Sequence, residues 1–286
     1  MSLPQAATLA YPGPRPTDAE IDTFGITDRG KVRPDSQDHF LICQLRKQIQ
    51  VHSTSLTDVS VTELGAQRLA FLMMVADGVG GNERGEEASR LALQGITRYV
   101  GESIQTYYAA DATDHDALAR SLSDAAIRCH ADLVRQSGGA TTLTLVIGVW
   151  PWAYIVQLGD SRYYLLRNGQ LMQISRDQTI AQDLIDQGVV SQSTGLRSRW
   201  ANVLSSALGG TNVNPVVTRI GLERTDVHLL CSDGLTKHVP DHRIEARLRE
   251  LTSSEQAARQ LLQDALDAGG TDNVTIIVAR IKPAAQ

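Results

Sequence analysis

Of five candidate aspartates, four recur in one local setting, at an edge of an apolar segment and beside glycine or a small polar residue, and the fifth, Asp38, stands at the start of a predicted strand beside Gln37. The five are Asp38, Asp77, Asp160, Asp233 and Asp272. Taken singly, an aspartate in such a place is more often a turn residue or a helix cap than a ligand. Five that converged would repel one another unless a cation neutralised them. Hard divalent ions such as Mg2+ or Mn2+ prefer oxygen ligands, so the pattern favours such an ion.

The segment around Asp77 carries this hypothesis furthest. An apolar run over 69–76 predicts a buried strand, and Asp77 follows it directly. Glycines stand at 78, 80 and 81, and a helical pattern begins at Glu83. A strand that delivers a carboxylate next to permissive backbone can present both that carboxylate and the bare Gly78 carbonyl to a metal ion.

Other catalytic signals are weak. The segment from Cys129 to Arg135 fits the Cys-x5-Arg spacing of cysteine phosphatases, but Cys129 lies on the apolar stripe of a predicted helix, as a core thiol does. The glycines at 78–81 lack the third glycine of a dinucleotide loop, and Asp77 would repel a pyrophosphate. His238 and His242 are four residues apart without a nearby third ligand for zinc.

Composition excludes several further classes. The 286 residues carry a net charge of -5 and no basic run, which argues against a nucleic-acid partner. Three cysteines favour free thiols in a reducing compartment. No signal peptide is visible, and the apolar run 143–156 is interrupted by Pro151. We therefore expect a cytoplasmic protein that is not inserted in a membrane.

The apolar periodicity predicts long helices and many short strands. Helices are expected over 83–104, 117–134, 177–187, 243–251 and 254–268. Strands are expected over 21–27, 40–42, 69–76, 141–149, 153–158, 162–167, 171–174, 216–221, 226–231 and 272–281, with 48–52 as a further candidate. Strands follow strands through short turns, and helices come in pairs. This order predicts an α+β fold, a four-layer αββα sandwich of two mostly antiparallel sheets with a helix pair on each outer face.

Several sequence words, in this order, resemble the PP2C-type (PPM family) metal-dependent protein serine/threonine phosphatases of bacterial type. They are Arg33-Pro-Asp-Ser-Gln-Asp38, Val75-Ala-Asp77-Gly78-Val-Gly-Gly81, Gly139-Ala-Thr-Thr142, Leu158-Gly-Asp160-Ser-Arg162, Ser175-Arg-Asp177, Leu204-Ser-Ser-Ala-Leu-Gly209, Cys231-Ser-Asp233-Gly-Leu235 and Gly270-Thr-Asp272-Asn273-Val274-Thr275. Together they cover roughly residues 21 to 281. The resemblance implies a phosphatase domain over 20–286 with a flap at about 177–205, after a flexible proline-rich leader over 1–19.

The resemblance also implies roles for single residues. Asp77 would bridge two metals, with the Gly78 carbonyl on one of them, and Asp233 and Asp272 would complete the first metal. A third ion would lie between Asp160 and Asp233.

Two further catalytic roles follow from the same resemblance. Asp38 would support the metal-bound waters, and Arg33 would bind the substrate phosphate with its planar fork.

The implied activity is hydrolysis of phosphoserine and phosphothreonine monoesters on proteins. A hydroxide bridging two divalent metals, Mn2+ or Mg2+, would attack phosphorus without a phosphoenzyme, and a third ion is an open possibility. The partners of such a phosphatase would be proteins phosphorylated by a Ser/Thr kinase in signalling. The alternative is a catalytically weakened PP2C-like module that binds phosphoproteins or regulates.

Four positions depart from the family pattern. Gln37 replaces a usual glutamate, and Ser36 stands where bacterial members often have asparagine. Val79 replaces a histidine proposed as general acid in animal members, and Lys237 stands where many members place another acid. These changes bear on the second and third metals and on the proton for the leaving group.

Overall fold

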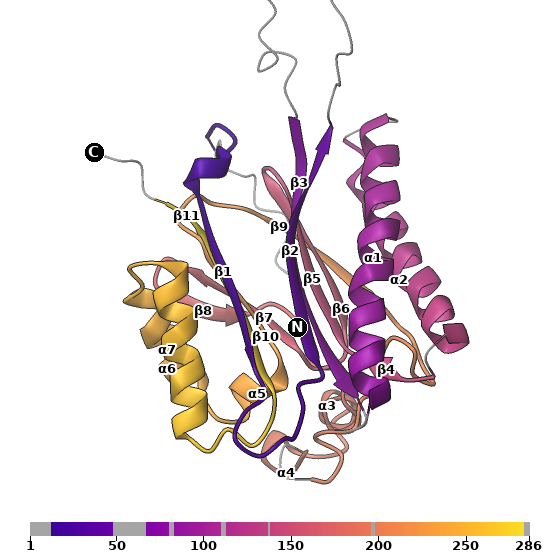
Figure 1. Ribbon diagram of the computed structural model, residues 1–286, viewed down its shortest axis with the longest axis vertical. Coiled ribbons are helices and arrows are strands. Elements are labelled where there is room, and N and C mark those ends of the chain that lie inside the picture. The colour runs from indigo at the N-terminus through magenta and orange to yellow at the C-terminus, as the bar shows by residue number, and fades with distance from the viewer. Residues whose placement is uncertain are drawn as a thin grey trace, which may run out of the picture.

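Two stacked antiparallel sheets, each covered on its outer face by a pair of helices, form the domain (Figure 1). The structure is a computed structural model that describes residues 13–47, 67–79, 83–109, 113–136, 138–195 and 198–282. The four-layer αββα arrangement expected from the order of elements is confirmed. The candidate strand over 48–52 and the glycines at 80 and 81 lie outside the described residues.

The first sheet contains five strands and carries the C-terminal helix pair. In sheet order the strands are β1 (Ile21–Asp28), β11 (Val274–Ile281), β10 (Val227–Cys231), β7 (Arg162–Arg167) and β8 (Gln170–Gln173). The covering helices are α6 (Asp241–Arg249) and α7 (Ser254–Asp267). Leu229, Ile276 and Val278 of the central strands pack against Leu261 of α7 in one apolar cluster.

The second sheet contains six strands and carries the other helix pair. In sheet order the strands are β2 (Asp38–Lys47), β3 (Gln67–Val79), β5 (Leu143–Val149), β6 (Trp152–Leu158) and β9 (Val216–Gly221), with the short β4 (Ala140–Thr141) paired to the end of β3. The covering helices are α1 (Glu83–Ala109) and α2 (His115–Gln136).

The apolar run of β3 is buried on both faces. Met74 belongs to the cluster under α1 and α2, whereas Met73 and Val75 belong to the cluster between the sheets, with Ile155 and Ile277. A strand covered on both faces needs a continuous apolar run rather than strict alternation, and this explains the sequence of β3.

β3 runs three residues beyond the expected end at Ala76, because Gly78 pairs with Thr141 and Val79 with Ala140 of β4. Asp77 therefore lies within a strand rather than at its tip. This pairing fixes the backbone of the central aspartate.

Short elements complete the chain. They are the 3-10 helix η1 (Asp18–Glu20), α3 (Ile180–Asp186), α4 (Gln192–Gly195) and α5 (Asp233–Thr236). The helix expected over 177–187 begins at Ile180, because the Thr179 hydroxyl accepts a hydrogen bond from the Gln182 amide at 3.2 Å and caps it. Gly13 contacts the domain body through its carbonyl, which accepts from Trp150 Nε1 at 3.2 Å. No helix in the described ranges is both long and apolar enough to cross a bilayer.

Candidate active site

All five aspartates singled out in the sequence lie close together. Figure 1 shows α5 and α3, near which they gather, at one end of the sandwich. Asp77, Asp160, Asp233 and Asp272 line an open cleft of about 970 Å³, and Asp38 lies beside them, 2% exposed. They come from β3, from the loop after β6, from the start of α5, from the loop before β11 and from the start of β2. Arg33, Gln37, Val79 and Lys237 line the same cleft.

Asp77 is held by its backbone, which leaves its carboxylate for the cleft. Its amide donates to Thr142 Oγ1 at 3.0 Å, and its carbonyl accepts from Thr141 Oγ1 at 2.8 Å and from the Thr142 amide at 2.9 Å. Burial raises the pKa of the Asp77 carboxyl well above its ordinary value, and the charge of Asp38 raises it further. An ionised Asp77 therefore needs a cation beside it.

Hydrogen bonds from β5, from β6 and from Thr142, just before β5, hold the loop that carries Asp160 in place. Ser161 Oγ shares a 2.7 Å hydrogen bond with Thr142 Oγ1, and the Ser161 carbonyl accepts from Thr144 Oγ1 at 2.8 Å and from Gln157 Nε2 at 2.7 Å. Thr142 thus contacts both the Asp77 and the Asp160 segments. Burial, together with the charge of Asp233, raises the pKa of Asp160 to about 7.

Gly78 must be glycine because the first turn of α1 packs against its backbone. A Cβ at this position would lie 2.3 Å from the Gly85 carbonyl oxygen, closer than any real Cβ contact. The Gly78 amide donates to the Gln37 carbonyl at 3.2 Å, so the Arg33–Asp38 segment is joined to the same point.

Asp233 opens the short helix α5 rather than simply ending a strand. A Cβ at the next residue, Gly234, would lie 1.9 Å from the Asn273 carbonyl oxygen, so only glycine permits this close approach. One helical turn later the Lys237 amide donates to the Asp233 carbonyl at 2.8 Å, and the Lys237 ammonium lies 2.5 Å from Asp233 Oδ2.

Two basic side chains bind Asp272. Arg33 Nε lies 2.8 Å from Oδ1 and Arg33 Nη2 3.1 Å from Oδ2, while Lys237 Nζ lies 2.8 Å from Oδ2. Burial disfavours charge on Asp272, but these cations outweigh it and lower its pKa. Burial likewise disfavours charge on Lys237, yet Asp233 and Asp272 raise its pKa overall.

Asn273 is a structural determinant that the sequence argument left without a role. Its Oδ1 accepts from the Gln37 amide at 2.9 Å, and its Nδ2 donates to the carbonyls of Arg29 and Asp35, both at 2.9 Å. One side chain therefore holds the loop before β2 against the start of β11. Its place directly after Asp272 was the available signal.

The carboxylates fit a divalent cation by their unsatisfied oxygens. Both oxygens of Asp38 and Oδ1 of Asp233 are buried without a hydrogen-bond partner, and the nearby hydroxyls of Ser232 and Thr275 do not reach good geometry to Asp38. Burial, with the charge of Asp233, raises the pKa of Asp38 to about 6. Buried carboxylates without partners are costly unless a cation or proton joins them.

In the present side-chain arrangement the carboxylates are not positioned together as metal ligands. Within the described ranges, no group of three acidic, histidine or cysteine side chains is arranged to hold an ion. In this arrangement Arg33 and Lys237 contact Asp272, and Lys237 also contacts Asp233.

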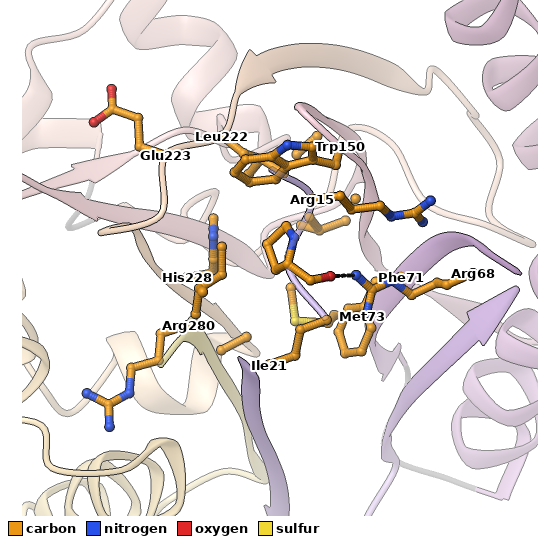
Figure 2. A pocket seen from close by; sticks show the side chains of 16 residues that line it. Arg15, Ile21, Arg68, Phe71, Met73, Trp150, Leu222, Glu223, His228 and Arg280 are labelled. Carbon is orange, nitrogen blue, oxygen red and sulfur yellow. Dashed lines mark hydrogen bonds between the residues drawn. The ribbon is translucent and has the colours of Figure 1, made fainter. Parts of the chain in front are cut away.

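A second cavity lies between the sheets at the opposite ends of the strands (Figure 2). It measures about 90 Å³ and is lined by apolar side chains such as Phe71, Met73 and Trp150. Arg68 at its edge pairs with Asp18 and the Pro16 carbonyl. The cavity is too small for a phosphopeptide and contains none of the five aspartates, so the open cleft is the site.

Comparison with known proteins defines the class. The Protein phosphatase 2C family matches residues 58–273, and the chain belongs to this family. The matched range includes Asp77, Asp160, Asp233 and Asp272 but not Arg33 or Asp38, which precede it.

Bacterial phosphatases are among the individual relatives. The serine/threonine protein phosphatase PstP of Mycobacterium tuberculosis is 34% identical over 217 residues, 74% of this chain and 40% of the relative. The chain thus spans less than half the length of that relative. The serine/threonine phosphatase stp of Listeria welshimeri is 30% identical over 72% of this chain and 83% of its own length.

Solved structures agree with the fold. The Mycobacterium tuberculosis phosphatase PstP/Ppp has 29% identity and a TM-score of 0.69 over 92% of this chain and 99% of its own. The catalytic domain of PstP, in complex with two manganese ions, has 26% identity and a TM-score of 0.64 over 92% of this chain and 99% of its own.

Proposed function

We propose that this chain is a metal-dependent protein phosphatase that hydrolyses phosphoserine and phosphothreonine monoesters. One observation carries the proposal: four aspartates from separate elements line one open cleft with Asp38 beside them, and both oxygens of Asp38 and Oδ1 of Asp233 are buried without a hydrogen-bond partner. Family membership supports it, as does the relative whose catalytic domain holds two manganese ions.

We propose Asp77, the Gly78 carbonyl, Asp160, Asp233 and Asp272 as the groups that hold two or three Mn2+ or Mg2+ ions. When bound, such ions act as Lewis acids and lower the pKa of water toward neutrality, which supplies a nucleophile at neutral pH. The backbone bonds from Thr141 and Thr142 keep Asp77 in place for this role. All of these oxygen donors suit hard cations.

Arg33 is proposed to bind the substrate phosphate. Its guanidinium now forms a two-point contact with Asp272, at 2.8 and 3.1 Å, and the same fork fits two phosphoryl oxygens. A side chain that is 45% exposed can leave this contact and turn into the cleft. Asp38, which lies buried beside the cleft, is proposed to support water in the site, for example by accepting its proton.

Val79 supplies no proton to the leaving group. It is 40% exposed at the cleft and has no ionisable atom. We propose that a water in the cleft, either free or bound to a metal, would give the departing serine or threonine oxygen its proton. Residues 177–205 are proposed as a flap that contacts the substrate, because Asn202 and Leu204 line the cleft.

The proposed substrates are proteins phosphorylated by a Ser/Thr kinase, and the proposed place of action is the cytoplasm. The three cysteines, Cys43, Cys129 and Cys231, are free thiols, as is usual in a reducing compartment.

A phosphothreonine peptide tests the activity. We expect wild-type protein to release phosphate with Mn2+ and to lose this turnover when a chelator is added. Asp77→Ala should abolish turnover while the protein stays folded. Turnover that survives the chelator, or full activity in Asp77→Ala, would contradict the proposal. Peptide binding without turnover would favour the alternative, a phosphoprotein-binding module.

A further inference from the structure

Lys237 lies inside the acidic cluster rather than on its rim. Its ammonium is 2.5 Å from Asp233 Oδ2 and 2.8 Å from Asp272 Oδ2, so one cation joins two of the proposed metal ligands. The side chain is 32% exposed, and both carboxylates are 17% exposed. The charge of Lys237 also acts on Asp160 across the cleft.

The short helix α5 keeps this cation in place. Asp233 is its first residue, and the Lys237 amide donates to the Asp233 carbonyl at 2.8 Å. The i,i+4 spacing in a helical turn brings two side chains together on one face. The ammonium is therefore held at high effective concentration beside the carboxylates. No flexible loop has to become ordered for this contact to form.

We propose that Lys237 is a built-in counter-cation that competes with divalent metal for Asp233 and Asp272. The ammonium lies on Oδ2 of both carboxylates, so a metal ion bound to the same two carboxylates would share their negative charge with it and repel it at close range. Metal binding must therefore displace Lys237 from at least one of the two aspartates. This inference rests on the proposed metal site and goes beyond it, because it assigns one residue the control of metal affinity.

The same contact has a second consequence. In protein prepared without metal, Lys237 neutralises part of the repulsion among the clustered carboxylates. Removing its charge should weaken the metal-free protein and strengthen metal binding, two effects of opposite sign. A residue that only contacted the substrate phosphate would produce neither.

Calorimetric titration of Mn2+ into chelator-stripped protein tests the inference. We expect Lys237→Gln to bind Mn2+ about 10-fold more tightly than wild type, a difference of about 1.4 kcal/mol. Lys237→Arg, which keeps the charge, should stay near wild type. Lys282→Gln, which removes one positive charge at the far end of β11, is the control and should not change Mn2+ binding.

Thermal unfolding gives a readout independent of activity. Without metal, Lys237→Gln should unfold several degrees below wild type, and saturating Mn2+ should close or reverse this gap. If Lys237→Gln does not fold without metal, its Mn2+-loaded form is titrated with a chelator of known affinity, which compares the same dissociation constants.

The outcomes separate the inference from the proposed function. Equal or weaker Mn2+ binding by Lys237→Gln overturns the inference. If wild type itself binds no Mn2+, the proposed function fails first.

Discussion

Asp38 and Asp77 lie directly opposite one another across the antiparallel strands β2 and β3. Like charges in this relationship are destabilising, and burial of Asp38 adds to the cost. Neither Asp38 oxygen has a hydrogen-bond partner to offset it. The pair is therefore arranged for a cation or a proton rather than for stability.

This relationship predicts a pH-dependent effect of Asp38→Asn in metal-free protein. The pKa of folded Asp38 is raised to about 6 from 3.8, so the folded state binds the proton more tightly and loses stability as pH rises between those values. Asn cannot ionise, so Asp38→Asn should match wild type near pH 4. It should exceed wild type at pH 7 by up to about 3 kcal/mol.

Urea unfolding at both pH values measures this difference. Comparing the two proteins at each pH cancels titrating groups away from Asp38, such as His228, whereas the effect of the Asp38 charge on Asp77 is part of the measured difference. Added Mn2+ should stabilise wild type more than the variant. If the difference in unfolding free energy between Asp38→Asn and wild type were the same at both pH values, the raised pKa of folded Asp38 would be contradicted.

Gly78→Ala should disrupt the site through the backbone. The new Cβ would meet the Gly85 carbonyl oxygen at 2.3 Å, so the Gly78 carbonyl has to move. We expect at least a 10-fold loss of Mn2+ affinity by calorimetry. Gly148→Ala is the matched control, since its Cβ would have no neighbour nearer than 3.6 Å and it lies at the other end of the sheet. Equal Mn2+ affinities in both variants would contradict a role for the Gly78 carbonyl in metal binding.

The ion pair of Arg162 and Asp177 should matter for stability. Arg162 Nε and Nη2 lie 2.9 and 2.7 Å from the two Asp177 oxygens, and the side chains are 21% and 16% exposed. Asp177→Ala removes the carboxylate from the guanidinium, which keeps its bond to the Tyr164 hydroxyl, and should cost about 2 kcal/mol, less than in a fully buried pair.

Glu255→Gln is the control for that pair. Its partnership with Arg259 is exposed on both sides, at 54% and 57%, and exposed pairs at this spacing contribute about 0.5 kcal/mol or less. Denaturant midpoints of the two variants make the comparison. A similar loss in both would show that the Arg162 contact has no special weight.

Cys129→Ala should retain full phosphatase activity. The thiol is buried against the Ala92 carbonyl oxygen at 3.6 Å, and burial raises its pKa to about 12. It is no thiolate nucleophile at neutral pH. We expect a stability loss of about 1 kcal/mol from the small cavity, with kcat unchanged. A large loss of kcat in folded protein would revive the cysteine-phosphatase interpretation.

The sequence was sufficient for the fold because the periodicities are strong. The buried run in β3 and the helical spacing in α1 and α2 each identified an element, with errors at the ends. The errors at the ends arise from tertiary contacts that the local sequence does not encode. β3 continues to Val79 because β4 pairs with it, and neither the pairing nor the two-residue β4 has a local signal.

For the site, the sequence identified the aspartates but not their contacts. Each Asp stood in a recognisable word, so the convergence in one cleft could be expected. The placement of Lys237 between Asp233 and Asp272 depends on the helical turn of α5, which four residues of sequence do not reveal. The three hydrogen bonds of Asn273 join segments more than 230 residues apart and need the folded chain.

The most direct test of the central claim is anomalous diffraction from a crystal soaked in Mn2+. We expect at least two manganese peaks in the cleft, ligated by Asp77, Asp233 and Asp272, with Lys237 displaced from one or both of its carboxylates. Manganese absent from the cleft, or bound elsewhere while Lys237 keeps both contacts, would contradict that claim.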